Sequence, residues 1–316
     1  MIYDGHCDVL GKMLEDASIH FEDDRKLDVT LSRLKAGGVK LQTFAIYVHE
    51  EEFTDRSIRP ILQSVDLFYT RILHGHGLRF IKTKSDLQKL SSSNDLGALL
   101  HLEGVDGLGG DLAYLRILFY LGVRTLGVTW NYGNWAADGI LEKRNGGFST
   151  KGLSLIEECN RLGIILDVSH LSERAFWDLA EASKKPYLAS HSNAYTICSH
   201  PRNLKDDQIR RVIADGGRIG ITFVPYFVSD RTTVQIKDIL AHTDHVCGMG
   251  GERSLVFGSD FDGIPSYIKG LEHPGNYPDL VNELQKHYPE SIVNGLLYDN
   301  MYRFLEKELP DEHNRG

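Results

Sequence analysis

Short apolar segments rich in β-branched residues alternate with amphipathic stretches along the whole chain, and this alternation constrains the fold most strongly. The apolar segments are the opening run 1–10 and the runs 39–48, 96–104, 124–130, 163–170, 186–192, 218–224 and 254–260. The intervening stretches 57–77, 112–122 and 172–183 place apolar residues at helical spacing. Ser172 is suited to cap the start of the last of these helices. Strands that alternate with helices predict a parallel sheet.

Eight strand–helix units favour a closed (β/α)8 barrel, the TIM barrel, whose active site lies at the carboxyl ends of the strands. A doubly wound sheet would instead need a glycine-rich phosphate loop after its first strand, and the segment DGHCD is not such a loop. A single barrel can accommodate 316 residues, and no linker or repeat divides the chain. We therefore expect one α/β domain over residues 1–316.

Composition and charge narrow the class of protein further. The chain is 41% hydrophobic and 25% charged, which is typical of a soluble globular protein, and its net charge of −9 argues against a nucleic-acid-binding surface. Its four cysteines show no CxxC spacing, which fits free thiols in a reducing compartment. The start resembles no secretory signal, and no segment is apolar over a membrane-spanning length. We expect a cytoplasmic protein without a nucleic-acid or membrane partner.

Polar residues fall at the ends of the predicted strands. His6 and Asp8 stand two apart in the opening run, so they project from the same side of a strand. Taken alone, such a pair is either a metal-binding pair or a hydrogen-bonded structural pair. The same type of residue ends four further strands, namely Glu103, His170, His191 and Asp260. Packing does not explain so many charged groups converging on one barrel mouth, because unpaired buried charge is costly.

This set of side chains predicts a metal site. Imidazoles and carboxylates without a thiolate cluster suit zinc, with manganese, cobalt or iron as substitutes. One metal needs three protein ligands and a water, so five ligands indicate two metals with a shared carboxylate. Glu103 is the candidate for that bridge because its strand lies between the two groups of ligands in sequence order.

The motifs resemble those of the renal (membrane) dipeptidase family of the amidohydrolase superfamily, whose fold is a barrel of the metallo-dependent hydrolase type. The matching segments are DGHCD, HLEG, LDVSH, SHSNA, SHPRNL and GSDFDG, and the tail segments YPDLVNELQ and LYDNMYRFLEKEL resemble the family's closing helices. The opening HxD is informative, because most amidohydrolases begin with HxH. The resemblance covers nearly the whole chain and the order of its motifs is specific.

The resemblance implies a role for each matching residue. The first zinc would be held by His6 and Asp8 and the second by His170 and His191, with Glu103 bridging the two. The attacking species would be a hydroxide that bridges the two metals. Asp260 would move the proton of the attacking water towards the leaving amine. Arg202, in SHPRNL, would pair with the free carboxylate of a dipeptide.

One position departs from the family pattern. Many members have a histidine at the end of the fourth strand, which polarises the substrate carbonyl, and here Trp130 takes that place. An indole N–H donates one hydrogen bond but carries no charge. Asn131 or Asn134 is the alternative donor at this position. Tyr226, which follows the seventh strand, is expected to line the pocket, as is Phe227.

Several other residues are weaker candidates. Asp262 competes with Asp260 for the proton-transfer role. His101 is expected to support the site from beneath or to belong to the core, while Asp167 and Ser169 flank a ligand and would orient it. A further HxH pair, His74 and His76, lies where a helix is expected to end, which favours a helix-terminal or surface role over metal binding.

The sequence therefore predicts a zinc-dependent dipeptidase with two Zn²⁺ per chain. L,D-dipeptides are included among the expected substrates, because the family tolerates a D-residue at the C-terminal position. The alternative keeps the barrel and its metals but changes the substrate to another amide, a lactam or an ester. A metal-binding protein without activity is a third reading, which the complete ligand set disfavours. The resemblance and base rates for oligomers favour a homodimer.

Overall fold

The computed structural model describes residues 1–48 and 57–311, and its central feature is a parallel barrel. Within the described residues, eight strands follow one another around this barrel in chain order. They are β1 (Ile2–Asp4), β2 (Val39–Tyr47), β4 (Leu96–Glu103), β5 (Val123–Gly127), β6 (Ile165–Asp167), β7 (Leu188–Ala189), β8 (Arg218–Ile221) and β9 (Leu255–Phe257). The last strand meets the first, since Gly5 N donates to Phe257 O (2.8 Å) and Asp260 N donates to His6 O (3.1 Å). The predicted barrel is confirmed.

Most of the strands end before the polar residues that the sequence assigned to their ends. β6 stops at Asp167, three residues before His170, and β9 stops at Phe257, three residues before Asp260. Both residues have a left-handed backbone, with φ of 70° and 67°, which no strand tolerates. Each of these two predicted strands is therefore a shorter strand followed by a turn that carries the polar side chain.

A ninth strand, β3 (Leu78–Phe80), was not predicted. It pairs with the first residues of β4, in the register Leu78↔Leu96 to Phe80↔Ala98. β5 pairs with β4 only from Leu100 onward, so the start of β4 has a free edge that β3 covers. The strand was missed because three half-buried residues give no readable periodicity.

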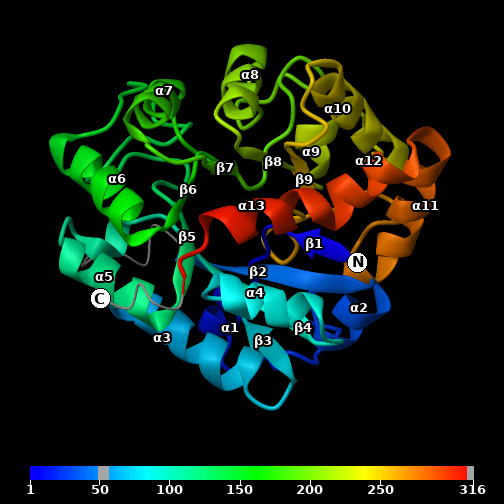
Figure 1. Ribbon diagram of the computed structural model, residues 1–316, viewed down its shortest axis with the longest axis horizontal. Coiled ribbons are helices and arrows are strands. Elements are labelled where there is room, and N and C mark those ends of the chain that lie inside the picture. Colours follow the sequence, from blue (N-terminus) through cyan, green and yellow to red (C-terminus); the bar gives the residue numbers. More distant parts are fainter. Residues whose placement is uncertain (49–56, 312–316) are drawn as a thin grey trace.

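Helices surround the barrel (Figure 1). They are α1 (Val9–Glu15), α2 (Leu31–Ala36), α3 (Arg59–Leu67), α4 (Lys84–Ser91), α5 (Leu112–Leu121), α6 (Thr150–Leu162), α7 (Glu173–Ala182), α8 (Asp206–Ala214), α9 (Pro225–Val228), α10 (Ile236–Gly248), α11 (Tyr277–His287), α12 (Glu290–Asn294) and α13 (Asn300–Glu308). The three predicted helices appear as α3, α5 and α7, and α3 continues as a π-helix over Phe68–Leu73. Ser172 caps α7 as predicted, because its hydroxyl accepts a hydrogen bond from Ala175 N.

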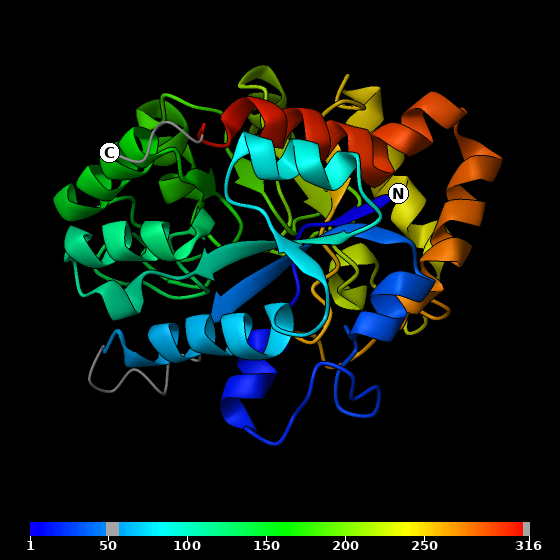
Figure 2. The same ribbon diagram turned by 60° about the horizontal axis from the view of Figure 1, so that its bottom comes forward.

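The two ends of the barrel differ, because a helix covers only one of them. At the amino ends of the strands, Met301, Phe304 and Leu305 of α13 pack against interior side chains such as Tyr3 and Leu41. α1 begins at Val9, after the short segment that follows the first strand, and lies on the other side of the barrel from α13 (Figure 2). The carboxyl end remains open for a site. None of the helices formed by the described residues is both long enough and apolar enough to cross a membrane.

Candidate metal centre and active site

A cavity of about 520 Å³ opens at the carboxyl ends of the strands. Predicted site residues in its wall are Asp8, Glu103, Trp130, Asn131, His170, Arg202, Tyr226 and Asp260. His6 and His191 lie beneath this wall and are almost completely buried. The structure therefore brings the whole predicted set together at one mouth, although the residues come from segments up to 254 positions apart in the sequence, as for His6 and Asp260.

Glu103, the last residue of β4, lies at the centre of the imidazoles. Its Oε2 faces His6 Nε2 at 3.4 Å, whereas its Oε1 faces His170 Nε2 at 3.0 Å and His191 Nε2 at 3.6 Å. Each carboxylate oxygen thus belongs to a different group of donor atoms that could bind a metal ion. This is the geometry expected of a carboxylate shared by two cations.

The first group of donors contains His6, Asp8 and Glu103, whose ligand atoms all lie within 4.8 Å of one another. His6 Nε2 is 3.5 Å from Asp8 Oδ2, and neither nitrogen of the His6 ring has a hydrogen-bond partner among the described residues. Burial opposes a charge on this imidazole, but the carboxylates of Glu103 and Asp8 raise its pKa well above the usual range. A buried ring with unpartnered nitrogens beside two carboxylates fits a metal ligand.

The second group contains Glu103, His170 and His191. The Nε2 atoms of the two imidazoles are 2.8 Å apart. At that distance the two nitrogens share a hydrogen bond if one of them carries a proton, and if neither does, their two lone pairs can converge on a cation. Burial, together with the positive charge of Arg202, lowers the pKa of His170 to about 4, and burial and His6 lower the pKa of His191 well below its usual range. Both rings are therefore neutral at neutral pH, which is the form that binds a metal.

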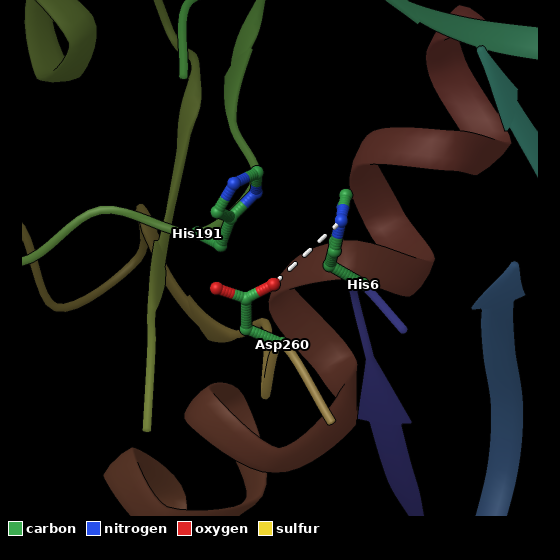
Figure 3. Close-up of side chains that lie close together, drawn as sticks. All are labelled: His6, His191 and Asp260. Atoms are coloured by element: carbon green, nitrogen blue, oxygen red, sulfur yellow. Dashed lines mark ion pairs between the residues drawn. The ribbon is translucent and has the colours of Figure 1, made fainter. Parts of the chain in front are cut away.

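Asp260 lies beside both groups and points towards His6 and His191 (Figure 3), and with these two imidazoles it forms a third group whose ligand atoms lie within 4.8 Å of one another. Its Oδ1 is 3.9 Å from His6 Nε2. Burial raises the pKa of Asp260 to about 7; His6 opposes this shift, while the carboxylates of Asp8 and Glu103 add to it. A carboxyl group with a pKa near neutrality is suited to accept and release a proton.

Asp262, the competing acid, is occupied by structural contacts. Its Oδ1 accepts hydrogen bonds from Lys12 Nζ (3.0 Å) and Asp28 N (2.8 Å), and its Oδ2 accepts one from Val29 N (2.9 Å). These bonds tie the turn after β9 to α1 and to the segment that follows it. The geometry therefore favours Asp260 for chemistry and Asp262 for holding the rim of the site.

Arg202 is a buried cation at the wall of the cavity. Its Nη2 donates to the carbonyl of His191 over a long 3.5 Å, its guanidinium lies 5.6 Å from the centre of the Phe227 ring, and its Nε has no hydrogen-bond partner among the described residues. Burial lowers the pKa of this guanidinium, and the charges of Asp260 and Glu103 oppose that shift. A buried guanidinium with unused donors is suited to bind an anionic ligand group.

The two candidate asparagines differ in their use. Asn134 is fully committed to its own loop, because its amide nitrogen donates to Asp106 and Val128 and its oxygen accepts from Ala136 N and Ala137 N. The expectation that Asn134 is an alternative donor to the substrate is therefore wrong. Asn131 lines the cavity, where its Oδ1 lies 2.9 Å from His170 Nδ1.

Aromatic residues form part of the cavity wall. The Trp130 ring lies between Tyr47 and His170, at centroid distances of 5.3 and 6.1 Å. Tyr226 stands at the mouth with 47% of its surface exposed, and Phe227 packs on the His200 ring at 4.2 Å. His200 was not predicted as a lining residue, although its position two residues before Arg202 is a usable signal.

Three further residues form a polar layer beneath the imidazoles. His101 donates or accepts at Nδ1 with Thr125 Oγ1 (2.9 Å), and its ring meets His6 edge-on at 5.6 Å. Ser190 Oγ contacts both Asp167 Oδ2 and His191 Nδ1. His101 and Asp167 were expected to support the site, but Ser190 was missed, although it directly precedes a predicted ligand. His76, in contrast, lies in the turn before β3, away from this mouth, where its Nδ1 is 3.2 Å from Glu22 Oε1.

A family model described as membrane dipeptidase (peptidase family M19) matches residues 1–315. An uncharacterized dipeptidase of Schizosaccharomyces pombe is 31% identical over 94% of this chain and 76% of its own length.

Two solved structures share the fold over nearly their entire length. A metallopeptidase of family M19, dipeptidase AC, superposes with a TM-score of 0.91 at 28% identity, covering 98% of both chains. A metallopeptidase from Rhodobacter sphaeroides, solved with a phosphinate mimic of the dipeptide L-Ala-D-Ala, superposes with a TM-score of 0.90 at 26% identity, covering 97% of this chain and 99% of the other.

Proposed function

The chain belongs to the membrane dipeptidase family, peptidase family M19, and is a metallo-dipeptidase, and we propose that it works with two zinc ions. The observation that carries this proposal is the placement of Glu103, whose two carboxylate oxygens face different groups of imidazoles at 3.0–3.6 Å. His6 and Asp8 would hold one zinc and His170 and His191 the other, with Glu103 shared. When bound, the two ions supply an activated water and polarise the scissile carbonyl.

Arg202 orients the substrate in this proposal. Its buried guanidinium would pair with the free carboxylate of a dipeptide, which fixes the distance from that carboxylate to the scissile bond. A longer peptide lacks a carboxylate at this distance, so the contact selects two-residue substrates. Trp130, Asn131 and Tyr226 would complete the substrate pocket, and the amide nitrogen of Asn131 would serve as a donor to the substrate.

Asp260 moves the proton. Its carboxylate lies next to both donor groups, where it would accept the proton of the attacking water and deliver it to the leaving amine. Without cations, burial raises the pKa of Asp260 to about 7. Binding of cations would lower that pKa, because the charged form of Asp260 would then be favoured.

The substrate class that we propose includes L,D-dipeptides. The Rhodobacter relative was solved with a mimic of L-Ala-D-Ala, and its fold matches this chain almost throughout. A panel of L,L- and L,D-dipeptides, together with an ester and a lactam, separates this proposal from the alternative of a different binuclear metal hydrolase. Hydrolysis of the ester or lactam in preference to every dipeptide would support the alternative.

The metal proposal is tested with Glu103→Gln. A neutral amide bridges two cations poorly, so the variant should hold less zinc and lose dipeptide hydrolysis. Zinc content by mass spectrometry and turnover of a dipeptide are the measurements, with Glu181→Gln on the outer surface of α7 as the control. Full activity in Glu103→Gln would contradict the shared-carboxylate site.

We also propose a cytoplasmic location and a homodimer. The four cysteines, Cys7, Cys159, Cys198 and Cys247, carry free thiols, which suits a reducing compartment. Fractionation of the source cells tests the location, and sedimentation of the purified protein tests the dimer.

A further inference from the structure

Ser190 lies between an imidazole of the metal site and a buried carboxylate, and we propose that it is a positioning residue that fixes the tautomer and orientation of His191. The inference rests on the proposed metal centre, because it concerns how one of its ligands is held. The relay consists of Asp167, at the end of β6, and of Ser190 and His191, which directly follow β7.

The direction of the hydrogen bonds follows from the number of protons. Ser190 Oγ donates its one proton to Asp167 Oδ2, in a short hydrogen bond. The same oxygen lies 2.7 Å from His191 Nδ1, so at this contact the hydroxyl must accept and Nδ1 must carry the hydrogen. A neutral imidazole protonated at Nδ1 has its lone pair on Nε2. That Nε2 faces Glu103 and His170, where the zinc would lie.

Asp167 is held as an acceptor by the backbone. Its Oδ1 accepts hydrogen bonds from Ser169 N and Ser190 N, both at 2.9 Å, and the side chain is buried. With Oδ2 bonded to the hydroxyl, both oxygens of the carboxylate are used as acceptors. The negative charge of Asp167 therefore reaches the imidazole through one hydroxyl, which strengthens the Nδ1–H bond and makes Nε2 a better metal ligand.

The backbone of Ser190 is held on two sides. Its backbone carbonyl lies so close to β8 and β9 that a Cβ at Gly220 or Gly258 would clash with it. Its backbone N–H is bound to Asp167. The backbone therefore places the hydroxyl between Asp167 and His191, as a positioning residue requires.

The other two imidazoles are held differently. His170 has the amide oxygen of Asn131 at its Nδ1 (2.9 Å), a neutral partner from a loop. His6 has no hydrogen-bond partner at either nitrogen among the described residues. The link to a buried carboxylate distinguishes His191, so we expect the zinc held by His170 and His191 to depend most on Ser190.

The test is the zinc affinity of Ser190→Ala, measured by competition with a chromophoric chelator. Loss of an outer partner of a histidine ligand typically weakens metal binding about 10–100-fold, and we expect a loss of this size for one of two zinc ions. Ser192→Ala is the matched control, because this buried serine contacts Ser169 Oγ (3.2 Å) rather than an imidazole. Affinities within about threefold of each other for the parent, Ser190→Ala and Ser192→Ala would overturn the proposal.

A second measurement needs no variant and therefore does not depend on whether Ser190→Ala folds. Nitrogen-15 spectra of the metal-free parent should show His191 with a protonated Nδ1 and an unprotonated Nε2. An unprotonated Nδ1 would overturn the relay. The proposed function fails in a different way, namely as a zinc-loaded parent that hydrolyses no dipeptide, so the two failures are distinguishable.

Discussion

Backbone strain at single residues is concentrated at the mouth of the barrel. Within the described residues, the non-glycine positions with positive φ are Asn145, His170, Asp260 and Asp262. Three of these four lie in the wall of the cavity. A left-handed backbone is unfavourable for side chains with a Cβ, and it persists where the surrounding structure enforces it. Here it turns the chain sharply after β6 and β9, so that the side chains of His170 and Asp260 face the centre of the site.

The first prediction at the residue scale concerns Arg202. Arg202→Ala should reduce kcat/KM for dipeptides. The lost transition-state stabilisation should be about 2–4 kcal/mol, as expected when a buried charge pair with the substrate carboxylate is removed. Steady-state kinetics with a dipeptide and its C-terminal amide provide the measurement. The amide should be a poor substrate of the parent and should lose much less on mutation, whereas equal losses for both would exclude recognition of the carboxylate.

The second prediction at this scale separates proton transfer from metal binding at Asp260. Asp260→Asn should keep nearly full zinc, because the ligand atoms of His6, Asp8, Glu103, His170 and His191 are unchanged. Its kcat should fall by about 10²–10⁴, the usual contribution of a positioned general acid–base, because an amide cannot carry the proton. Zinc content and kcat are measured together. A metal-depleted variant that regains activity with added zinc would make Asp260 a ligand instead.

At the scale of elements, ion pairs on the outside of the barrel join neighbouring helices. Glu158 of α6 accepts from Arg116 of α5 (2.9 Å) and from Arg161 one turn further along α6 (2.7 Å). The guanidinium of Arg161 is the main cause that lowers the pKa of Glu158 to about 2, and burial opposes the shift. Both arginines are substantially exposed, so solvent screens this interaction.

The ion pairs of Glu158 predict how the stability of the fold depends on pH. The pKa of Glu158 is lower in the folded than in the unfolded state, so the carboxylate stabilises the fold above pH 4.5 and this contribution is lost as pH falls towards 2. Glu158→Gln should therefore lower the free energy of unfolding by about 1 kcal/mol at pH 7 and by less at pH 3.5. Urea unfolding at both values measures it, with Glu157→Gln as the exposed control. A loss that is independent of pH would contradict this account.

At the scale of the whole molecule, the barrel is closed at one end and charged at the other. α13 seals the amino end with apolar side chains, whereas the carboxyl end gathers carboxylates and imidazoles that are largely buried. Burial is the main cause that raises the pKa of Asp8 and Asp260, His6 opposes the shift, and repulsion from neighbouring carboxylates adds to it. The metal-free fold is therefore under electrostatic stress that cations would relieve.

Metal removal should accordingly destabilise the whole protein. A ligand that binds only the folded state stabilises it by about 4 kcal/mol at 1,000 times its dissociation constant, and we expect chelation to lower Tm by about 5–15 °C. Scanning calorimetry of the zinc-loaded and chelated protein is the measurement. Glu103→Gln, which should hold less zinc, should respond much less to the chelator. Identical melting curves for the zinc-loaded and chelated parent would contradict the expectation that bound metal stabilises the fold.

The sequence by itself determined the class of fold and the set of polar residues at the barrel mouth. Hydrophobic periodicity is a local property, so the eight strands and the helices α5 and α7 could be read without a structure. The carboxyl ends of parallel strands meet at one end of a barrel, so His6, Glu103, His191 and their partners were expected together. The family resemblance added the roles.

Only the tertiary structure decided how those side chains face one another. It showed that Asn134 is used within its own loop, that Asp262 is bonded to Lys12 and that Ser190 bridges Asp167 and His191. These contacts depend on where turns place individual atoms after the strands end, and they join residues far apart along the chain. No periodic pattern encodes such distances, because they are fixed only when the barrel closes and its neighbouring turns pack together.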